Sequence, residues 1–337
     1  MLGEIKMLVN QKKLSIAIPS YNRCKYLDLL LASILKQYND CASLVEIIVS
    51  DNASIDATPQ VVAKYIEFGL AIKYIRNVEN LGPDRNIAQC FSLATGEYVW
   101  IMGDDDYFLD QALVTVLGVI NKTQSDPIGI IHVSATSKSL VPKEINLIKL
   151  EQSISRDDFV KKINVFLTFI SGNIVNKNIF INNCDLELIN QYLDTNLVQL
   201  SWTYQIIIHS INFAIIETPL IFAQAENSGG YNIFNVFAVS QSKIAQIELK
   251  NYPKYIKLIE KGTMLKCFPV WIHLYLCNRL TSFEKTEQDI FQVLQSAYGK
   301  YFEFWVLIYP MKFMPVFIRR VFKKLVVLFW NFSLWIR

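Results

Sequence analysis

Two glycine-rich phosphate-binding fingerprints are missing from this sequence of 337 residues. No G-x-G-x-x-G follows the first predicted strand, and no G-x-x-x-x-G-K-[ST] occurs at any position. The missing phosphate loop disfavours a nucleotidyltransferase that would make sugar nucleotides. If the chain binds a nucleotide, it must hold it in another way.

Cysteine pairs with metal-site spacing are also absent. The six cysteines show no C-x-x-C spacing, which argues against a zinc site and favours reduced thiols in a cytosolic chain. Residues 1–13 contain no apolar core followed by a small-residue cleavage site, so we expect no signal peptide.

Charged residues are few and unevenly placed. They make up 19% of the chain against 52% hydrophobic residues, which excludes disorder and allows a sizeable core. Residues 299–337 hold seven basic residues and one acidic residue, and the remainder of the chain is slightly acidic. We therefore expect no nucleic-acid partner, but a local anionic surface as the partner of the tail.

Apolar strands alternate with helical patterns through the first 120 residues. Strands are predicted at 14–19, 46–50, 72–76 and 98–102, and helices at 26–37, 58–68, 84–93 and from Leu109. This alternation predicts an α/β doubly wound sheet. The polar loops all follow strands, and that edge of such a sheet is where ligands bind.

Three consecutive carboxylates, Asp104, Asp105 and Asp106, follow the predicted strand at 98–102 and Gly103. At the end of a buried strand they are suitable oxygen ligands for Mg²⁺ or Mn²⁺. The alternative is a solvated acidic turn that caps the next helix, because aspartate is favoured at helix starts.

Five short motifs occur in order, at residues 18–23, 49–56, 80–82, 94–98 and 103–106. Together they resemble the signature of family 2 glycosyltransferases with the GT-A fold. The run Asn-Leu-Gly-x-Asp-Arg-Asn at 80–86 and the Gly-Asp-Asp-Asp ending resemble the O-antigen branch that includes abequosyltransferases.

The resemblance implies a GT-A doubly wound mixed sheet flanked by helices. We expect a glycosyltransferase domain at 1–225, divided into a nucleotide-sugar half (14–120) and an acceptor half (121–225). Residues 226–337 are expected to form a helical C-terminal region that associates with membranes.

The first two loops supply the nucleoside contacts that the resemblance implies. Pro19, Tyr21 and Arg23 match the loop that lies against the base, although Tyr21 has ordinary packing as an alternative role. Asp51 matches the acid that hydrogen-bonds base and ribose, and Asn52 shapes its loop. A local Asx-type turn is a second role for Asp51.

The diphosphate and the metal are expected further along the chain. Arg85 matches the basic residue that reaches the diphosphate, with a solvated charge on a helix as the alternative. The resemblance implies that Asp104 contacts the ribose or the metal. It implies that Asp105 and Asp106 contact the metal and its waters. Many relatives have an aspartate where this chain has Gly103, so the identity of the ligating carboxylates stays open.

The catalytic base is harder to assign. In many relatives a Glu-Asp pair precedes a Pro-Leu by about 20 residues, but the corresponding residues 198–201 contain no acid. Asp194 is the candidate base, with Asp185 and Glu187 as the other nearby carboxylates. A surface position is the alternative for Asp194.

Two further features precede the tail. His209 lies in a predicted apolar helix, where a core histidine is favoured over a ligand. The glycine-rich segment 227–231 is expected to be a mobile loop near the acceptor or a link to the helical tail.

The tail is aromatic and basic. Arg319, Arg320, Lys323 and Lys324 recur at i, i+4 spacing and are expected to share one helix face. The apolar stretch 325–336 is shorter than the roughly 20 residues that span a bilayer. This pattern predicts a helix lying on an anionic leaflet, with a dimer interface as the alternative.

The resulting prediction is a metal-dependent glycosyltransferase, peripheral on the cytoplasmic inner face of the cell membrane. It would move a sugar, with a deoxyhexose among the candidates, from a nucleotide-diphosphate donor to a polyprenyl-diphosphate-linked saccharide in O-antigen or other surface polysaccharide synthesis. The alternative is a catalytically silent GT-A module acting as a membrane-bound scaffold for another transferase.

Overall fold

The computed structural model describes most of the chain. The described residues are 12–122, 126–137, 148–224, 230–280 and 289–336, with side chains described up to residue 330. The predicted mobile segment 227–231 therefore lies outside the described residues except for Gly230 and Tyr231.

The chain divides into two compact units. The first comprises Met1–Phe159, Leu167–Asp194 and Val198–Ala225, and the second Val160–Phe166, Thr195–Leu197 and Glu226–Arg337. We describe each unit separately.

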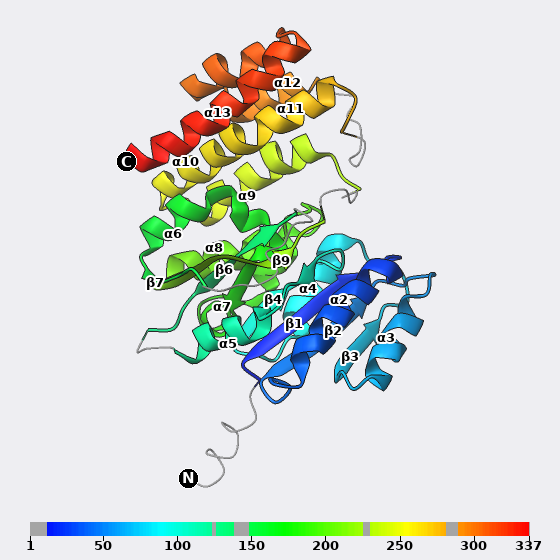
Figure 1. Cartoon of the computed structure of the whole chain (residues 1–337). Coiled ribbons are helices and arrows are strands. Elements are labelled where there is room, and N and C mark those ends of the chain that lie inside the picture. The colour runs from blue at the N-terminus through cyan, green and yellow to red at the C-terminus, as the bar shows by residue number, and fades with distance from the viewer. Residues whose placement is uncertain (1–11, 123–125, 138–147, 225–229, 281–288, 337) are drawn as a thin grey trace. The chain divides into compact units, whose positions relative to one another are not determined.

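Strands and helices alternate in the first part of the first unit (Figure 1). They are β1 (Leu14–Ser20), α2 (Cys24–Tyr38), β2 (Val45–Asp51), α3 (Thr58–Glu67), β3 (Ile72–Arg76), α4 (Pro83–Leu93) and β4 (Tyr98–Ile101). All seven match predicted elements, with bounds that differ by at most two residues. Prolines in the first turns of α3 and α4 suit the helix start, where a backbone N–H has no helical partner.

The second part of this unit is less regular. Its strands are β5 (Tyr107–Phe108), β6 (Ile130–Thr136), β7 (Leu150–Ile154), β8 (Asn173–Asn176) and β9 (Phe213–Phe222). Its α-helices are α5 (Ala112–Asn121), α6 (Arg156–Ile163), α7 (Lys177–Asn183) and α8 (Gln199–His209), and 3₁₀ helices cover Asn164–Thr168, Ile170–Gly172 and Leu186–Tyr192. The helix α6 and the turn after it pass from the first unit into the second.

The strands form one mixed sheet in the order β3-β2-β1-β4-β8-β6-β9-β5, with β7 paired to β9. β3, β2, β1 and β4 are parallel neighbours, and β8 runs antiparallel between β4 and β6. The prediction of a mixed α/β sheet is confirmed. In the parallel register Ser20 pairs with Asp51 and Ala17 with Ile101, so β1, β2 and β4 end at the same edge.

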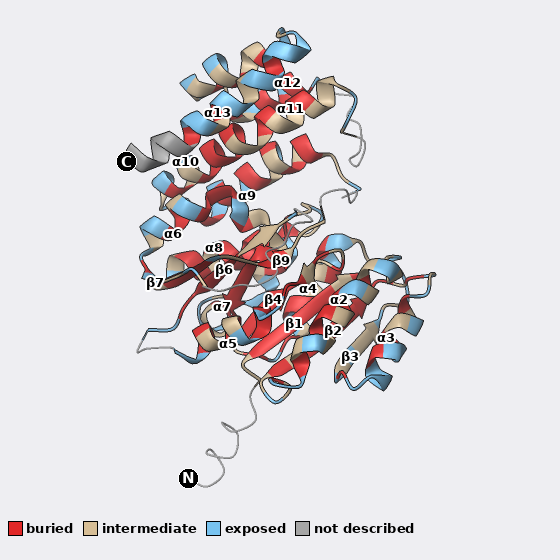
Figure 2. Cartoon of the chain, in the orientation of Figure 1, coloured by how far each residue is buried: buried red, intermediate tan, exposed pale blue. Residues whose placement is uncertain are grey.

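The core lies along these central strands, which are buried over most of their length (Figure 2). Leu14, Ile16 and Ile18 of β1 are completely buried. Leu27 and Leu31 of α2 belong to the same hydrophobic cluster, and α4 packs on β1 and β2. Strands buried on both faces are continuous apolar runs, which explains why the sequence pattern identified them.

One predicted helix start is shifted, and one local prediction was wrong. The helix expected from Leu109 begins at Ala112, because β5 pairs with β9 and the Leu109 N–H donates to the Leu220 carbonyl at 2.9 Å. His209 is exposed rather than a core residue. It is the last residue of α8, and a polar ring at a helix C-terminus remains near water and near the unpaired carbonyls.

The second unit is helical. It contains α9 (Gln241–Glu248), α10 (Pro253–Gly262), α11 (Phe268–Leu276), α12 (Ile290–Tyr298) and α13 (Val316–Ile336), with π-helical segments at Asn235–Ser240, Thr263–Cys267 and Phe304–Ile308 and a 3₁₀ turn at Tyr309–Lys312. Within the described residues, no helix is both long enough and apolar enough to cross a bilayer.

The predicted tail is part of the core of the second unit. Val326 and Trp330 of α13 are 1% and 3% exposed and pack with Phe268 and Leu294. The prediction that the tail's four basic residues share one face was wrong. Arg319 is buried and its neighbour on α13 is exposed, because consecutive residues on a helix point about 100° apart.

Candidate active site

The acidic turn Asp104–Asp106 lies at the edge where β1, β2 and β4 end. The Asp106 N–H donates to the Gly103 carbonyl at 3.1 Å, which closes the turn. Asp104 is 4% exposed and Asp106 5%, while Asp105 is half-buried. The alternative of a solvated acidic turn is therefore wrong for two of the three carboxylates.

Asp104 is held by side chains from the end of β1. The Ser20 hydroxyl donates to its Oδ2 at 2.7 Å, and Arg23 Nη1 lies 3.1 Å from its Oδ1. Burial raises the pKa of Asp104 to about 6, against the opposing effect of the Arg23 charge. The same Nη1 lies 3.4 Å from Asp105 Oδ2, so Arg23, predicted to face the base, bridges two of the carboxylates.

Asp106 is buried against the turn that precedes β8. Ser171 Oγ hydrogen-bonds its carboxylate and accepts the Gly103 N–H at 2.9 Å, and the Gln224 N–H donates to Asp106 Oδ1 at 3.2 Å. Burial raises the pKa of Asp106 to about 7 despite these hydrogen bonds. Trp100 fixes the turn, because its indole N–H donates to the Ser171 carbonyl at 2.7 Å.

The glycine at 103 has little space for a side chain. A Cβ there would lie 2.9 Å from Asp105 Oδ1 and 3.3 Å from Ser171 Oγ. A side chain at this position would have to push the Asp105 carboxylate aside.

Asp51 ends β2 and is completely buried. Its Oδ1 accepts the Ser54 N–H at 2.8 Å, so the turn named as its alternative role is present. Its Oδ2 accepts the Tyr74 hydroxyl at 2.6 Å and lies 3.5 Å from Arg76 Nε. Burial raises the pKa of Tyr74, and the bond to Asp51 raises it further. Direct contact of Asp51 with a nucleoside would require these partners to move.

Asn52 ties the loop after β2 to the loop after β3. Its amide nitrogen donates to Asn80 Oδ1 at 2.7 Å and to the Gly82 carbonyl at 3.2 Å. Its oxygen accepts the Leu81 N–H at 2.9 Å and the Asn77 side chain at 3.0 Å. Gly82 has φ +84°, a conformation that glycine adopts without strain.

The loop after β1 is joined to the same structure. The Asn22 N–H donates to Ser54 Oγ at 2.9 Å, and the Ile55 N–H donates to Asn22 Oδ1 at 2.8 Å. Pro19 is half-buried, whereas Tyr21 is 43% exposed. The Tyr21 ring is therefore accessible to a ligand rather than packed in the core.

Arg85 and Asp194 form a two-point ion pair, with Nη1–Oδ1 at 2.6 Å and Nη2–Oδ2 at 3.2 Å. Both side chains are exposed, so the pair adds little stability. The hydrogen bond from Arg85 lowers the pKa of Asp194, and a carboxylate with a lowered pKa is a weaker base. The residues predicted for the diphosphate and for the catalytic base thus lie together.

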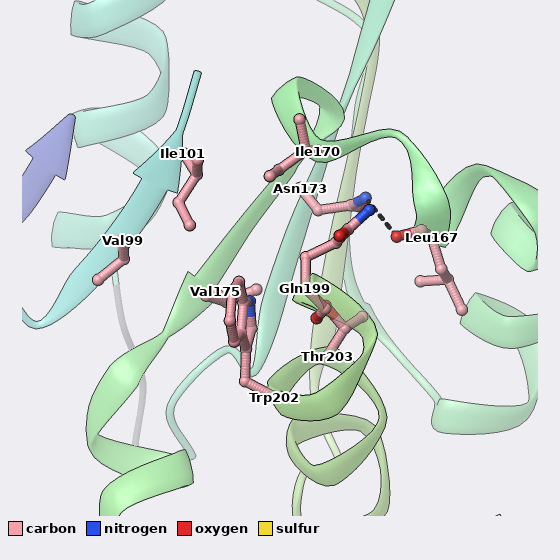
Figure 3. A pocket seen from close by; sticks show the side chains of 9 residues that line it. All are labelled: Val99, Ile101, Leu167, Ile170, Asn173, Val175, Gln199, Trp202 and Thr203. Carbon is pink, nitrogen blue, oxygen red and sulfur yellow. Dashed lines mark hydrogen bonds between the residues drawn. The ribbon is translucent and has the colours of Figure 1, made fainter. Parts of the chain in front are cut away.

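A small cavity lies beside β4 and β8 (Figure 3). Its volume of about 10 Å³ is room for about one water molecule. Gln199, the first residue of α8, lines it and donates from Nε2 to the Thr168 carbonyl at 3.0 Å. Its Oε1 is buried with no hydrogen-bond partner among the described residues. Gln199 stands near the position at which many relatives carry an acid. Its amide oxygen accepts a hydrogen bond but is not a general base at neutral pH.

Several of these residues were given no role in the site from the sequence. They are Ser20, Tyr74, Asn77, Asn80, Ser171 and Gln199. Asn77 and Asn80 follow a predicted strand, and a polar residue in that position indicates the ligand-binding edge of the sheet. No comparable signal marks Ser171, which reaches Gly103 from 68 residues away.

The acidic turn has the ligand chemistry of a hard divalent cation. Mg²⁺ and Mn²⁺ prefer carboxylate oxygens, and burial without full charge compensation raises the pKa values of Asp104 and Asp106. Within the described residues, no group of three His, Cys, Asp or Glu is arranged to hold an ion. Asp104, Asp105 and Asp106 fit the cation by donor type alone, because Arg23 neutralises two of them and the three are not arranged as an ion-binding group.

Comparison with known sequences identifies relatives of this chain. Residues 15–182 match the sequence model of glycosyl transferase family 2. The chain is 41% identical over 114 residues to the abequosyltransferase RfbV of Salmonella typhimurium, covering 34% of each chain. It is 33% identical over 164 residues to the GalNAc(5)-diNAcBac-PP-undecaprenol beta-1,3-glucosyltransferase of Campylobacter jejuni, covering 48% of this chain and 49% of the other. These matches span a third to a half of the relatives' lengths.

Solved structures show the same fold. The crystal structure of residues 1–349 of Staphylococcus aureus TarS in complex with UDP-GlcNAc has a TM-score of 0.58 and 17% identity, covering 94% of this chain and 89% of that one. The structure without ligand gives a TM-score of 0.55. The predicted GT-A fold and the predicted family are both confirmed. Through residues 15–182, the chain belongs to glycosyl transferase family 2.

Proposed function

We propose that this chain is a metal-dependent glycosyltransferase that moves a sugar, with a deoxyhexose among the candidates, from a nucleotide-diphosphate donor to a lipid-linked saccharide. The product belongs to O-antigen or another surface polysaccharide. The observation that carries the proposal is the buried acidic turn Asp104–Asp106, placed beside Asp51 and Asn52 at the ligand-binding edge of the sheet.

The nucleoside of the donor is assigned to the loops after β1 and β2. Tyr21 offers an exposed ring, and Pro19 and Arg23 lie in the same loop. Asn52 joins the neighbouring loops through its hydrogen bond to Asn80. Asp51 holds the turn at Ser54 by accepting the Ser54 N–H. An exposed aromatic ring beside polar loops suits a flat, polar ligand such as a base with its ribose.

The diphosphate is assigned to Arg85 and to the acidic turn. A guanidinium suits phosphate oxygens, and Arg85 is exposed at the start of α4. A bound Mg²⁺ or Mn²⁺ would supply electrostatic stabilisation of the departing nucleoside diphosphate. Asp104, Asp105 and Asp106 would hold that ion, and Arg23 adds a positive charge next to them.

The acceptor is assigned to a polyprenyl-diphosphate-linked saccharide. The name of the Campylobacter relative gives an undecaprenol-diphosphate-linked acceptor for that protein. Asp194 stays the candidate base, and it would have to leave Arg85 before its pKa suited proton transfer. Such an acceptor is found at membranes, so we place the enzyme at the cytoplasmic inner face, with the basic second unit against the anionic surface.

Donor binding is the experiment that tests this function. The purified chain is incubated with Mn²⁺ and a panel of nucleotide-diphosphate sugars, and its melting temperature is measured. The preferred donor at about 100 times its Kd is expected to add about 2.7 kcal/mol of stability. A panel in which no nucleotide sugar raises the melting temperature, and no sugar is transferred, would overturn the proposal.

Gly103→Ala is expected to lower the transfer rate at least about tenfold, because the new methyl group pushes the Asp105 carboxylate aside. The contact is with the end of a side chain, so the melting temperature should change little. Gly118→Ala in α5 is the matched control, since a Cβ there meets nothing within 4 Å. Full activity in Gly103→Ala would show that the position of Asp105 does not matter.

A silent scaffold is the second candidate, and Gln199 favours it. An amide at the start of α8 cannot serve as a base at neutral pH, and Asp194 is paired with Arg85. The two candidates differ in one measurement. Hydrolysis or transfer of a sugar nucleotide by the purified chain would exclude the scaffold.

A further inference from the structure

Helices α11 and α13 pack against each other in the second unit and bring five basic side chains together. They are His273 and Arg279, on and just after α11, and Arg319, Arg320 and Lys323 on α13. Burial lowers the pKa of His273, and the positive charges of the other four residues lower it further. We call these five residues the basic cluster.

Two members of the basic cluster are buried, and each has a side-chain nitrogen that no described residue hydrogen-bonds. His273 is 7% exposed and Arg319 5% exposed. Within the part of the chain that the structure describes, His273 Nδ1 and Arg319 Nε have no hydrogen-bond partner. A buried guanidinium among like charges is unfavourable unless an anion joins it.

No acidic side chain of the described residues neutralises the cluster. The ion pairs of this unit join Lys261 to Glu303, Lys300 to Glu260, and Lys312 to Asp289. None of the ion pairs among described residues includes a member of the basic cluster. The described residues therefore supply no ion-pair partner to the basic cluster.

The exposed side of α13 carries a row of large apolar side chains. Phe317, Val321, Leu325 and Leu328 are 72%, 60%, 56% and 61% exposed, and their spacing places them on one side of the helix. Arg320 is exposed beside them. The stripe lies on the side of α13 opposite the packed Arg319 and borders the basic cluster only at the exposed Arg320. An apolar stripe with a cation at its border matches a ligand that has an anionic group joined to hydrocarbon.

We propose that the basic cluster is a binding site for the phosphate group of an anionic membrane lipid, whose hydrocarbon meets the exposed apolar stripe of α13. Guanidinium groups suit phosphate oxygens, and Arg279, Arg320 and Lys323 form the accessible rim. This inference rests on the membrane contact proposed above but not on sugar transfer.

Vesicle binding of the full chain tests the site. Phosphatidylcholine vesicles with and without phosphatidylglycerol are mixed with the chain and sedimented. Removing two rim charges with Arg320→Gln and Lys323→Gln is expected to weaken binding to the phosphatidylglycerol vesicles roughly thirtyfold. The matched control removes two exposed charges outside the cluster, Lys243→Gln with Lys250→Gln, and should retain most of the binding.

Arg319→Leu separates a binding role from a structural one. Without lipid, its melting temperature should equal or exceed that of the wild type, because an unpaired buried charge is gone. Inorganic phosphate at constant ionic strength should stabilise the wild type more than Arg319→Leu. A lower melting temperature in Arg319→Leu, with wild-type vesicle binding, would show that Arg319 is structural and overturn the site.

Two further outcomes decide the source of the phosphate and the independence of the site. Equal losses of vesicle binding in the cluster and control variants would show that net charge alone attracts the chain. A higher melting temperature with free phosphate, without any vesicle binding, would show a site for a soluble anion. Either result overturns the lipid assignment. Donor-induced stabilisation by a nucleotide sugar should persist in all these variants, so failure here leaves the proposed transferase function intact.

Discussion

Asp105→Asn is expected to reduce sugar transfer about 10³-fold while the chain remains folded. The substitution keeps the size of the side chain and removes the negative charge that would help to hold a divalent cation. The Asp105 side chain is 22% exposed, so little of the core is disturbed. Initial transfer rates and melting temperatures measured on the same preparations check both parts of the expectation.

Asp110→Asn is the matched control for that experiment. Asp110 is an exposed acid of the same connection, a few residues after the turn, and its loss should leave the rate within about twofold. Chelation of divalent cations should reduce the wild-type rate as strongly as Asp105→Asn does. Wild-type turnover by the variant, with or without chelator, would remove the metal role from the acidic turn.

Trp100→Ala is expected to lower the free energy of unfolding of the first unit by about 3–5 kcal/mol. Trp100 is completely buried in β4, where its ring lies 4.6 Å from that of Phe108. The substitution leaves a cavity and removes the indole donor of the Ser171 carbonyl. Urea unfolding followed by circular dichroism gives the loss of stability.

Trp100→Phe distinguishes the two effects. It retains most of the ring volume, so the loss of stability should fall to about 1–3 kcal/mol, the range expected for an unsatisfied buried carbonyl. Transfer should still decrease, because Ser171 also hydrogen-bonds Asp106. If Trp100→Phe matches the wild type in both stability and rate, the indole bond has no part in holding the site.

Local patterns were sufficient to predict one half of the site. The strands that end near Ser20, Asp51 and Asp104 are short apolar runs, and each is followed by polar residues. Parallel pairing then places the ends of such strands at one edge, as the register of β1 with β2 and β4 shows. The acidic turn and the loop around Asn52 could therefore be found without knowledge of tertiary contacts.

The other half depends on contacts that no local pattern contains. Ser171 reaches the acidic turn because β8 enters the sheet antiparallel between β4 and β6, and no periodicity specifies which distant strands pair. The split between Arg319 and Arg320 likewise depends on α11 packing against one side of α13. His209 was misplaced because an apolar helical pattern does not show where the helix reaches the surface.

The cross-linked loops around Asn52 have a consequence for donor affinity. Asn52 binds four groups of the connection after β3, and Asn22 joins the first two loops through Ser54 and Ile55. These segments are already ordered, so little conformational entropy is lost when a ligand binds there. A preorganised surface of this kind favours fast, rigid docking of the nucleoside and leaves larger adjustments to the exposed Arg85 and Asp194.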